Sequence, residues 1–173
     1  MKTEQLLHEN VPLKKPVASV ILVCDNIMSP ANAGALIRLS DAFGIQKLFF
    51  CGKKIDMESN RLKKTARSTE KYVTISQENS ILPLLKKLKS KGYNLAGLEI
   101  TTSSMAIQNF IPTGHATALV LGNEQAGISH DVLPLLDQTL HIDMFGKNSS
   151  MNVSHAAAIA MYELTKPTTP HEK

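Results

Sequence analysis

The stretch that decides the fold is Ser149-Ser150-Met151-Asn152-Val153-Ser154-His155-Ala156-Ala157-Ala158-Ile159-Ala160, in which small, hydrogen-bonding residues run directly into an alanine-rich helix. We expect Ser149 and Ser150 to cap that helix, because their hydroxyls can accept hydrogen bonds from its first N–H groups. Two other segments, 26–38 and 121–129, have the same loop-then-helix character. The sequence therefore predicts one composite site built from three loops.

Short apolar, β-branched runs alternate with helical patterns along the rest of the chain. The predicted strands are 17–24, 47–51, 72–75, 94–98, 117–121 and 139–142. The predicted helices cover 36–43, 81–88 and 153–164, and glycine ends the first two. This alternation predicts an α/β fold with a mostly parallel sheet flanked by helices. Because each of the three loops follows a strand, they would meet at the carboxyl ends of the strands, where such sheets bind ligands.

Length and composition predict one globular domain over residues 1–173, with a core at about 17–164. The ends before Pro16 and from Pro167 are expected to be flexible or lightly docked. A hydrophobic fraction of 43% and a charged fraction of 20% are typical of a soluble protein. No apolar run is long enough for a membrane span, and the polar N-terminus does not resemble a secretory signal. We therefore expect a cytoplasmic protein without a membrane partner.

The cysteines and histidines form no metal-binding pattern. Cys24 and Cys51 lie in or beside predicted strands without CxxC spacing, and we expect two buried, reduced thiols. The six histidines are scattered, and none belongs to an HExxH motif. No metal cofactor is expected.

The net charge of +4 is unevenly distributed. A polar, loop-like stretch contains a first basic cluster, and its mixture of cations and hydroxyls suits phosphate contacts. The members of this cluster are Arg61, Lys63, Lys64, Arg67 and Lys71. A second run, at 86–91, is interpreted as a solvated helix face. Because only 5% of the residues are aromatic and tryptophan is absent, a base-stacking platform is not expected.

Taken singly, the first two loops carry weak signals. In the first, Asn32 is a plausible helix N-cap, and Gly34 permits a close backbone approach. Arg38 points away from the apolar stripe that contains Leu36, as a surface arginine would. The second loop has GxxxxG spacing without GK[ST], which excludes a P-loop, and the first lacks the GxGxxG of an ordinary dinucleotide site.

Together the three loops are much more specific. They read NxxSPANAGALIRLSDAFG, LVLGNEQAGIS and IDMFGKNSSMNVSHAAAIA. In order and spacing they resemble motifs 1, 2 and 3 of the SpoU/TrmH-type RNA ribose 2′-O-methyltransferases of the SPOUT superfamily. The resemblance covers the chain from about Val17 to Leu164. It implies an enzyme that uses S-adenosylmethionine and has a deep trefoil knot near its C-terminus, which periodicity alone does not predict.

The resemblance also implies roles for individual residues. The catalytic residues would be Asn32, Arg38, Glu124, Ser150 and Asn152, and the cofactor pocket would be lined by Leu98, Gly122, Ile142, Met144 and Met151. Members of the family usually act as homodimers with the active site at the dimer interface. The segment 64–70, KTARSTE, resembles the family's KTAxGxE-like segment, with Ser68 where glycine is usual. This favours Arg61, Lys63, Lys64 and Arg67 as RNA contacts.

Two positions depart from the family pattern. Leucine is usual where Met151 stands, and the substitution preserves volume in an apolar pocket. Proline is usual where Asp143 stands. Asp143 would either relax the rigidity of its loop or touch the polar part of the cofactor.

The expected function is transfer of a methyl group to a ribose 2′-hydroxyl. A compact chain is similar to several tRNA-modifying members, so tRNA is favoured over ribosomal RNA. Arginine stays charged at any pH compatible with folding, so Arg38 is expected to hold the phosphate and the hydroxyl while another group takes the proton. The alternatives are a catalytically silent RNA-binding relative, disfavoured by the retained catalytic residues, and a nucleotide-binding α/β enzyme of unrelated chemistry.

Overall fold

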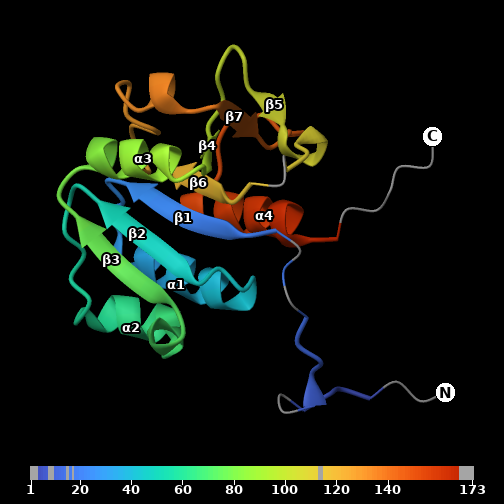
Figure 1. Ribbon diagram of the computed structural model, residues 1–173. Helices are drawn as coiled ribbons and strands as arrows, with labels where there is room; N and C mark the ends of the chain where they lie inside the picture. Colours follow the sequence, from blue (N-terminus) through green and yellow to red (C-terminus); the bar gives the residue numbers. More distant parts are fainter. Residues whose placement is uncertain (1–3, 8–9, 15, 17, 113–114, 168–173) are drawn as a thin grey trace.

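Figure 1 shows the computed structural model of the chain, which describes residues 4–7, 10–14, 16, 18–112 and 115–167. Residues 4–7 and 10–14 of the N-terminal extension are exposed. Of the tail predicted to be flexible, all but Pro167 lies outside the described residues.

A seven-stranded sheet forms the centre of the molecule, in the order β3-β2-β1-β6-β4-β7-β5, and every pair of neighbouring strands is parallel. The strands are β1 (Val20–Asp25), β2 (Lys47–Cys51), β3 (Thr74–Glu78), β4 (Asn94–Leu98), β5 (Met105–Ala106), β6 (Thr117–Leu121) and β7 (Gln138–His141). The predicted parallel sheet is therefore confirmed. The two-residue strand β5 was not predicted.

Among the described residues, four α-helices and three short 3-10 helices accompany the strands, and α4 follows the last strand. The α-helices are α1 (Pro30–Ala42), α2 (Asn60–Ala66), α3 (Ile81–Ser90) and α4 (Val153–Thr165), and the 3-10 helices are η2 (Thr69–Lys71), η3 (Ile107–Asn109) and η4 (Leu133–Leu135). The prediction that the first basic cluster is loop-like is wrong over α2, because Leu62 and Ala66, four residues apart, bury one side of a helix. The loop at 121–129 leads only into η4, and not into an α-helix.

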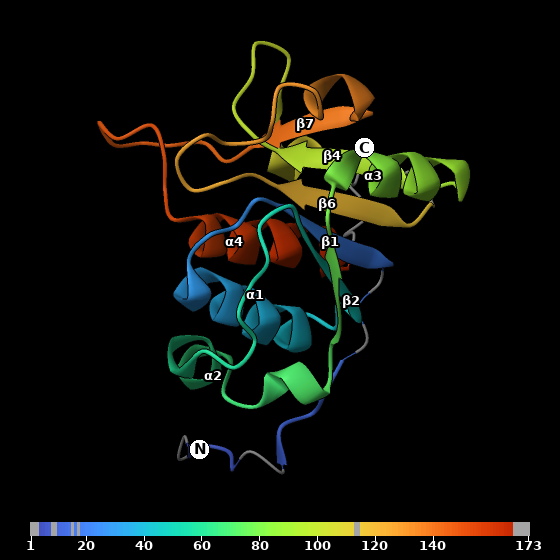
Figure 2. The same cartoon turned by 90° about the vertical axis from the view of Figure 1, so that its left-hand side faces the viewer.

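The helices lie on both faces of the sheet. Figures 1 and 2 show α1, α2 and α4 on one face and α3 on the other. Alternate residues of β1 serve the two cores: Leu22 and Cys24 pack on the α1 side, and Val23 packs on the α3 side. The expected buried thiols are confirmed, since Cys24 and Cys51 are buried and unpaired, and burial raises the pKa of the Cys51 thiol to about 12.

Close packing fixes α1 between its neighbours. A side-chain carbon at Gly34 would come within 2.5 Å of the Leu62 carbonyl oxygen, so α2 can approach α1 only at a glycine. On its other side α1 runs along α4, and the Phe43 and Tyr162 rings meet edge to face near the ends of the two helices, 6.5 Å apart. The trefoil knot stays a prediction. No helix in the described part of the chain is long and apolar enough to cross a membrane.

Candidate functional site

The three predicted loops leave the carboxyl ends of β1, β6 and β7, which lie at one edge of the parallel sheet, with β4 between β6 and β7. The first joins β1 to α1, the second follows β6, which pairs with β1, and the third joins β7 to α4. The helices that begin there are capped by residues other than those predicted. Ser29 caps α1, with Pro30 at its first position, because proline fits the first turn without losing a hydrogen bond. Asn152 caps α4 through a 2.8 Å hydrogen bond from the Ser154 N–H, and Ser149 and Ser150 lie outside the cap.

The side chain of Glu124 joins the first and second loops. Its Oε1 accepts hydrogen bonds from the Ser29 N–H (3.1 Å) and the Asn32 Nδ2 (2.8 Å), and its Oε2 accepts one from the Met28 N–H (3.2 Å). Partial burial acts to raise the pKa of Glu124, but these hydrogen bonds outweigh it and hold that pKa below the ordinary value. The carboxylate is therefore charged at neutral pH, and both of its oxygens have partners.

The third loop joins the same arrangement through two amides. Asn152 Nδ2 donates to Asn32 Oδ1 at 3.0 Å, while Asn152 Oδ1 serves the cap of α4. A carboxylate only accepts, so Glu124 dictates which end of the Asn32 amide carries the donor, and Asn32 in turn orients Asn152. One N–H remains on each amide nitrogen for a further partner. Glu124, Asn32 and Asn152 thus form a directed chain across all three loops.

A buried carboxylate, Asp25, holds together the two loops that carry Asn32 and Glu124. Asp25 is fully buried and accepts hydrogen bonds from Asn26 Nδ2 and from the Ser129 N–H, both at 2.9 Å. Asn123 Nδ2 then donates to the Asn26 carbonyl oxygen at 2.7 Å. These contacts fasten the first loop to the second. Sequence reasoning missed Asp25, although a charged residue that ends an apolar run directly before a site loop was a usable signal.

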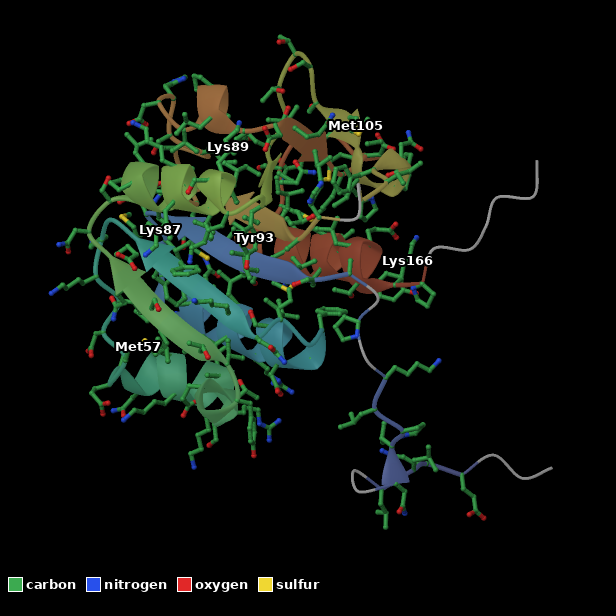
Figure 3. The ribbon with its side chains drawn as sticks, viewed as in Figure 1. Met57, Lys87, Lys89, Tyr93, Met105 and Lys166 are labelled. Carbon is green, nitrogen blue, oxygen red and sulfur yellow. The ribbon has the colours of Figure 1, made fainter. Side chains whose placement is uncertain are left out.

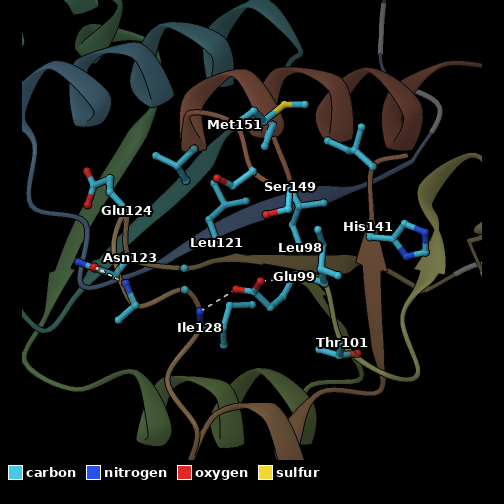
Figure 4. A pocket seen from close by; sticks show the side chains of 18 of the residues that line it. Leu98, Glu99, Thr101, Leu121, Asn123, Glu124, Ile128, His141, Ser149 and Met151 are labelled. Atoms are coloured by element: carbon cyan, nitrogen blue, oxygen red, sulfur yellow. Dashed lines mark hydrogen bonds between the residues drawn. The ribbon is translucent and has the colours of Figure 1, made fainter. Parts of the chain in front are cut away.

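A cavity of about 810 Å³ lies beside the Glu124–Asn32–Asn152 hydrogen bonds, between the ends of β4, β6 and β7. All five residues predicted to bind the cofactor line it, namely Leu98, Gly122, Ile142, Met144 and Met151. Figure 4 shows Leu98, Leu121 and Met151 around the cavity, with Glu124 at one side. Glu124, Ser150 and Asn152 also line the cavity, whereas Asn32 and Arg38 do not. The cavity therefore combines apolar walls with a polar rim.

The second loop folds back to form one side of the cavity. A side-chain carbon at Gly122 would lie 2.2 Å from the Gly127 carbonyl carbon and 2.3 Å from the Ile128 nitrogen, so only glycine permits this turn. Glu99 Oε2 accepts a hydrogen bond from the Ile128 N–H at 3.0 Å, drawn in Figure 4. Glu99 lies in the cavity wall and belongs to none of the three motifs, so no sequence signal marked it.

The model of the SpoU rRNA Methylase family matches residues 19–162, which contain all of this geometry. The chain belongs to the SpoU rRNA methylase family. It is 29% identical over 152 residues to the 23S rRNA (guanosine(2553)-2′-O)-methyltransferase RlmP of Bacillus subtilis, covering 87% of this chain and 60% of that protein. It is 28% identical over 154 residues to a tRNA (guanosine(18)-2′-O)-methyltransferase of Aquifex aeolicus, covering 87% of this chain and 71% of that protein.

Solved structures of SpoU methylases share the fold. The A. aeolicus TrmH/SpoU tRNA modifying enzyme superposes with a TM-score of 0.78 at 27% identity, over 87% of this chain and 76% of that one. The SpoU methyltransferase AviRb from Streptomyces viridochromogenes, in complex with the cofactor AdoMet, gives a TM-score of 0.75 at 25% identity, over 95% of this chain and 62% of that one.

Arg38, predicted to be catalytic, lies apart from the cavity. Arg38 is exposed on α1, six residues after Asn32, which corresponds to about 9 Å along the helix axis. It faces away from the buried Leu36, as predicted. Among the described residues, Arg38 makes no side-chain hydrogen bond or ion pair. Its side chain is therefore available to a partner outside this chain.

The predicted RNA contacts lie on or next to α2 and are exposed. Lys63 pairs with Glu58, whereas Arg61, Lys64 and Arg67 have no such pair within the described ranges. Lys53 is nearer the site: its N–H donates to Asn26 Oδ1 at 3.3 Å, and its ammonium nitrogen lies 3.9 Å from the Met28 sulfur. Its position just after a predicted strand was the signal that could have found it.

The second basic run lies away from this site, whereas His130 and His141 line the cavity. Lys87 and Lys89 project from α3 on the opposite face of the sheet (Figure 3), and Lys89 pairs with Asp137 at 2.7 Å. This agrees with the interpretation as a solvated face. Within the described residues, no group of three or more His, Cys, Asp or Glu side chains is placed to hold a metal ion.

Proposed function

We propose that this protein transfers a methyl group from S-adenosylmethionine to a ribose 2′-hydroxyl of RNA, as a cytoplasmic homodimer. The observation that carries the proposal is the Glu124–Asn32–Asn152 chain at the rim of the 810 Å³ cavity. The polypeptide as a whole covers 60% of the length of RlmP and 71% of the length of the A. aeolicus tRNA enzyme. The fuller coverage of the tRNA enzyme favours tRNA, and RlmP makes ribosomal RNA the second candidate.

The cavity suits the proposed cofactor. Its volume lies within the range of about 300–1,000 Å³ that small-molecule sites occupy. Leu98, Ile142 and Met151 offer apolar walls for an adenine ring and an alkyl chain, and Glu124 and Asn152 supply polar groups at the rim. When bound, S-adenosylmethionine supplies an electrophilic methyl group on a positively charged sulfur.

The protein's own side chains then have to orient the ribose 2′-hydroxyl, which is a weak nucleophile. The remaining N–H groups of Asn32 and Asn152 can hold ribose oxygens, and Glu124 keeps both amides in the donating orientation. The guanidinium of Arg38 would hold the phosphate and stabilise the negative charge that develops on the 2′-oxygen. A pH–rate profile of Arg38→Lys tests this role, because lysine keeps the charge and loses the planar, forked donor geometry. A wild-type profile and rate would exclude it.

A homodimer would bring Arg38 to a cavity. Exposed residues of α4 recur at helical spacing and include Ile159, 39% exposed, and Tyr162, 57% exposed. Arg38 lies on the adjacent helix α1, on the same face of the sheet. A second copy that covered α1 and α4 would bury these apolar side chains and could present its Arg38 to the first copy's cavity.

Two measurements test the proposal. Tritiated S-adenosylmethionine is incubated with tRNA and, separately, with ribosomal RNA from a strain that lacks the gene, and label is expected in tRNA. Label only in ribosomal RNA would support the second candidate, and none in either would refute the function. For the dimer, inactive Arg38→Ala and Asn152→Ala proteins are mixed: if Arg38 acts across the interface, exchange restores about a quarter of the sites. A mixture that stays inactive contradicts that arrangement.

A further inference from the structure

The loop that follows β7 is tied to its neighbour by Asp143. Strands β5 and β7 pair in parallel, with Ala106 opposite His141. Just past the ends of both strands, Nε2 of Gln108, which lies in η3, donates to Oδ2 of Asp143, which lies in the loop, at 2.7 Å. The pairing of β5 with β7 therefore brings η3 next to the loop that follows β7.

His141 adds a second link to the same neighbour. Its Nδ1 lies 3.0 Å from Ser104 Oγ, and its Nε2 lies 3.4 Å from Asp143 Oδ1. Because the Ser104 hydroxyl already donates to the Thr101 carbonyl oxygen at 2.9 Å, it accepts from His141 Nδ1–H. The end of β7 and the first residues of its loop are thus joined to the 101–108 segment at two places.

Asp143 does not line the proposed cofactor cavity, but the residues on either side of it in sequence do. Ile142 and Met144, its neighbours in sequence, both line the 810 Å³ cavity. Beyond them the loop projects into solvent, and Phe145 is 97% exposed. For the described residues 142–151, every side-chain hydrogen bond to another segment, up to the Asn152 cap, runs through Asp143.

We propose that the Asp143–Gln108 pair is a positioning device for the cofactor, which holds Ile142 and Met144 where they form the cavity wall. This proposal rests on the proposed function. It concerns Asp143 and Gln108, neither of which belongs to the Glu124–Asn32–Asn152 hydrogen-bond chain. The pair fixes the backbone of a loop that otherwise projects into solvent. Without the pair, the loop would spend less time in the binding-competent position, and the apparent affinity would fall by that fraction.

The test is the dissociation constant of S-adenosylmethionine, measured by isothermal titration calorimetry on the full chain. Asp143→Ala and Gln108→Ala should each weaken binding about 5- to 10-fold, and the double variant should be no weaker than Asp143→Ala alone, because Asp143→Ala already removes the contact with Gln108 along with the longer one to His141. Asp143→Asn, which keeps an acceptor for Gln108 Nε2, should recover most of the affinity. Glu78→Ala, an exposed carboxylate on β3, is the matched control, and KM for RNA should not change.

Each outcome has a distinct meaning. Wild-type affinity in Asp143→Ala and Gln108→Ala, or additive losses in the double variant, would overturn the positioning role and leave the proposed function intact. Absence of S-adenosylmethionine binding by the wild-type chain would overturn the proposed function and this inference with it. Gln108 is exposed, so Gln108→Ala gives a result even if Asp143→Ala does not fold.

Discussion

The substitution Glu124→Gln tests most directly whether the three loops act as one site. The carboxylate accepts three hydrogen bonds, two at Oε1 and one at Oε2. A glutamine amide has one accepting oxygen, so in either orientation its NH₂ group faces at least one N–H donor. The least damaging orientation keeps the bonds to Ser29 and Asn32 and opposes the Met28 N–H. The variant therefore preserves shape and removes both the charge and one acceptor.

The size of the effect follows from the contact that is lost. A hydrogen bond to a charged group contributes about 1.5–3 kcal/mol, and the exposure of Glu124 reduces this to about 1–1.5 kcal/mol. Since about 1.4 kcal/mol corresponds to a tenfold change in rate, methyl transfer should slow about tenfold. The free energy of unfolding should fall by about 1 kcal/mol.

Single-turnover methylation with labelled S-adenosylmethionine and saturating RNA measures the step at issue. If Glu124 acts through Asn32, the double variant Glu124→Gln/Asn32→Ala should be as slow as Asn32→Ala alone. Glu78→Gln, the same chemical change on an exposed strand, should keep the wild-type rate. The reasoning fails if Glu124→Gln reacts at the wild-type rate, or if the two substitutions slow the reaction independently.

Three further predictions concern the turns and the carboxylate. Gly122→Ala would force backbone atoms of the second loop apart, so the affinity for S-adenosylmethionine, measured by calorimetry, should fall at least about tenfold; unchanged affinity would contradict the packing. Ser68 has a φ of 66°, so Ser68→Gly should stabilise the protein by about 0.5–1 kcal/mol in thermal unfolding, and a loss of stability would count against strain there. The lowered pKa of Glu124 implies that its stabilisation is complete above its ordinary pKa of about 4.3 and is lost as pH falls through the lower folded value. Urea unfolding of wild type and Glu124→Gln should thus converge only at acidic pH, and convergence near neutrality would refute it.

Elements with strong local patterns could be predicted from the sequence. The apolar run that became β1 and the amphipathic spacing of α3 each carry their own signal, so the parallel sheet followed from them. Strand β5 has only two residues and exists because β7 lies beside it, which is a tertiary effect. In α2, the frequent basic residues masked the spacing of Leu62 and Ala66.

The site was less predictable because its contacts join distant parts of the chain. Glu124 and Asn32 are 92 residues apart, and Asn32 and Asn152 are 120 apart. The family resemblance grouped these residues, but no local pattern could show which oxygen accepts from which nitrogen. The predicted helix caps were wrong for a local reason. Several neighbouring hydroxyl and amide side chains could each cap the helix, and the backbone path selected Ser29 and Asn152.

Nucleoside analysis distinguishes methyl transfer to a ribose from methyl transfer to a base. RNA from a strain lacking the gene is incubated with the protein and methyl-labelled S-adenosylmethionine, digested to nucleosides and analysed by mass spectrometry. We expect the labelled methyl on the ribose of one nucleoside, at a position that resists alkaline cleavage, and no label with Asn152→Ala. Label on a base, or no label in any RNA, would contradict it.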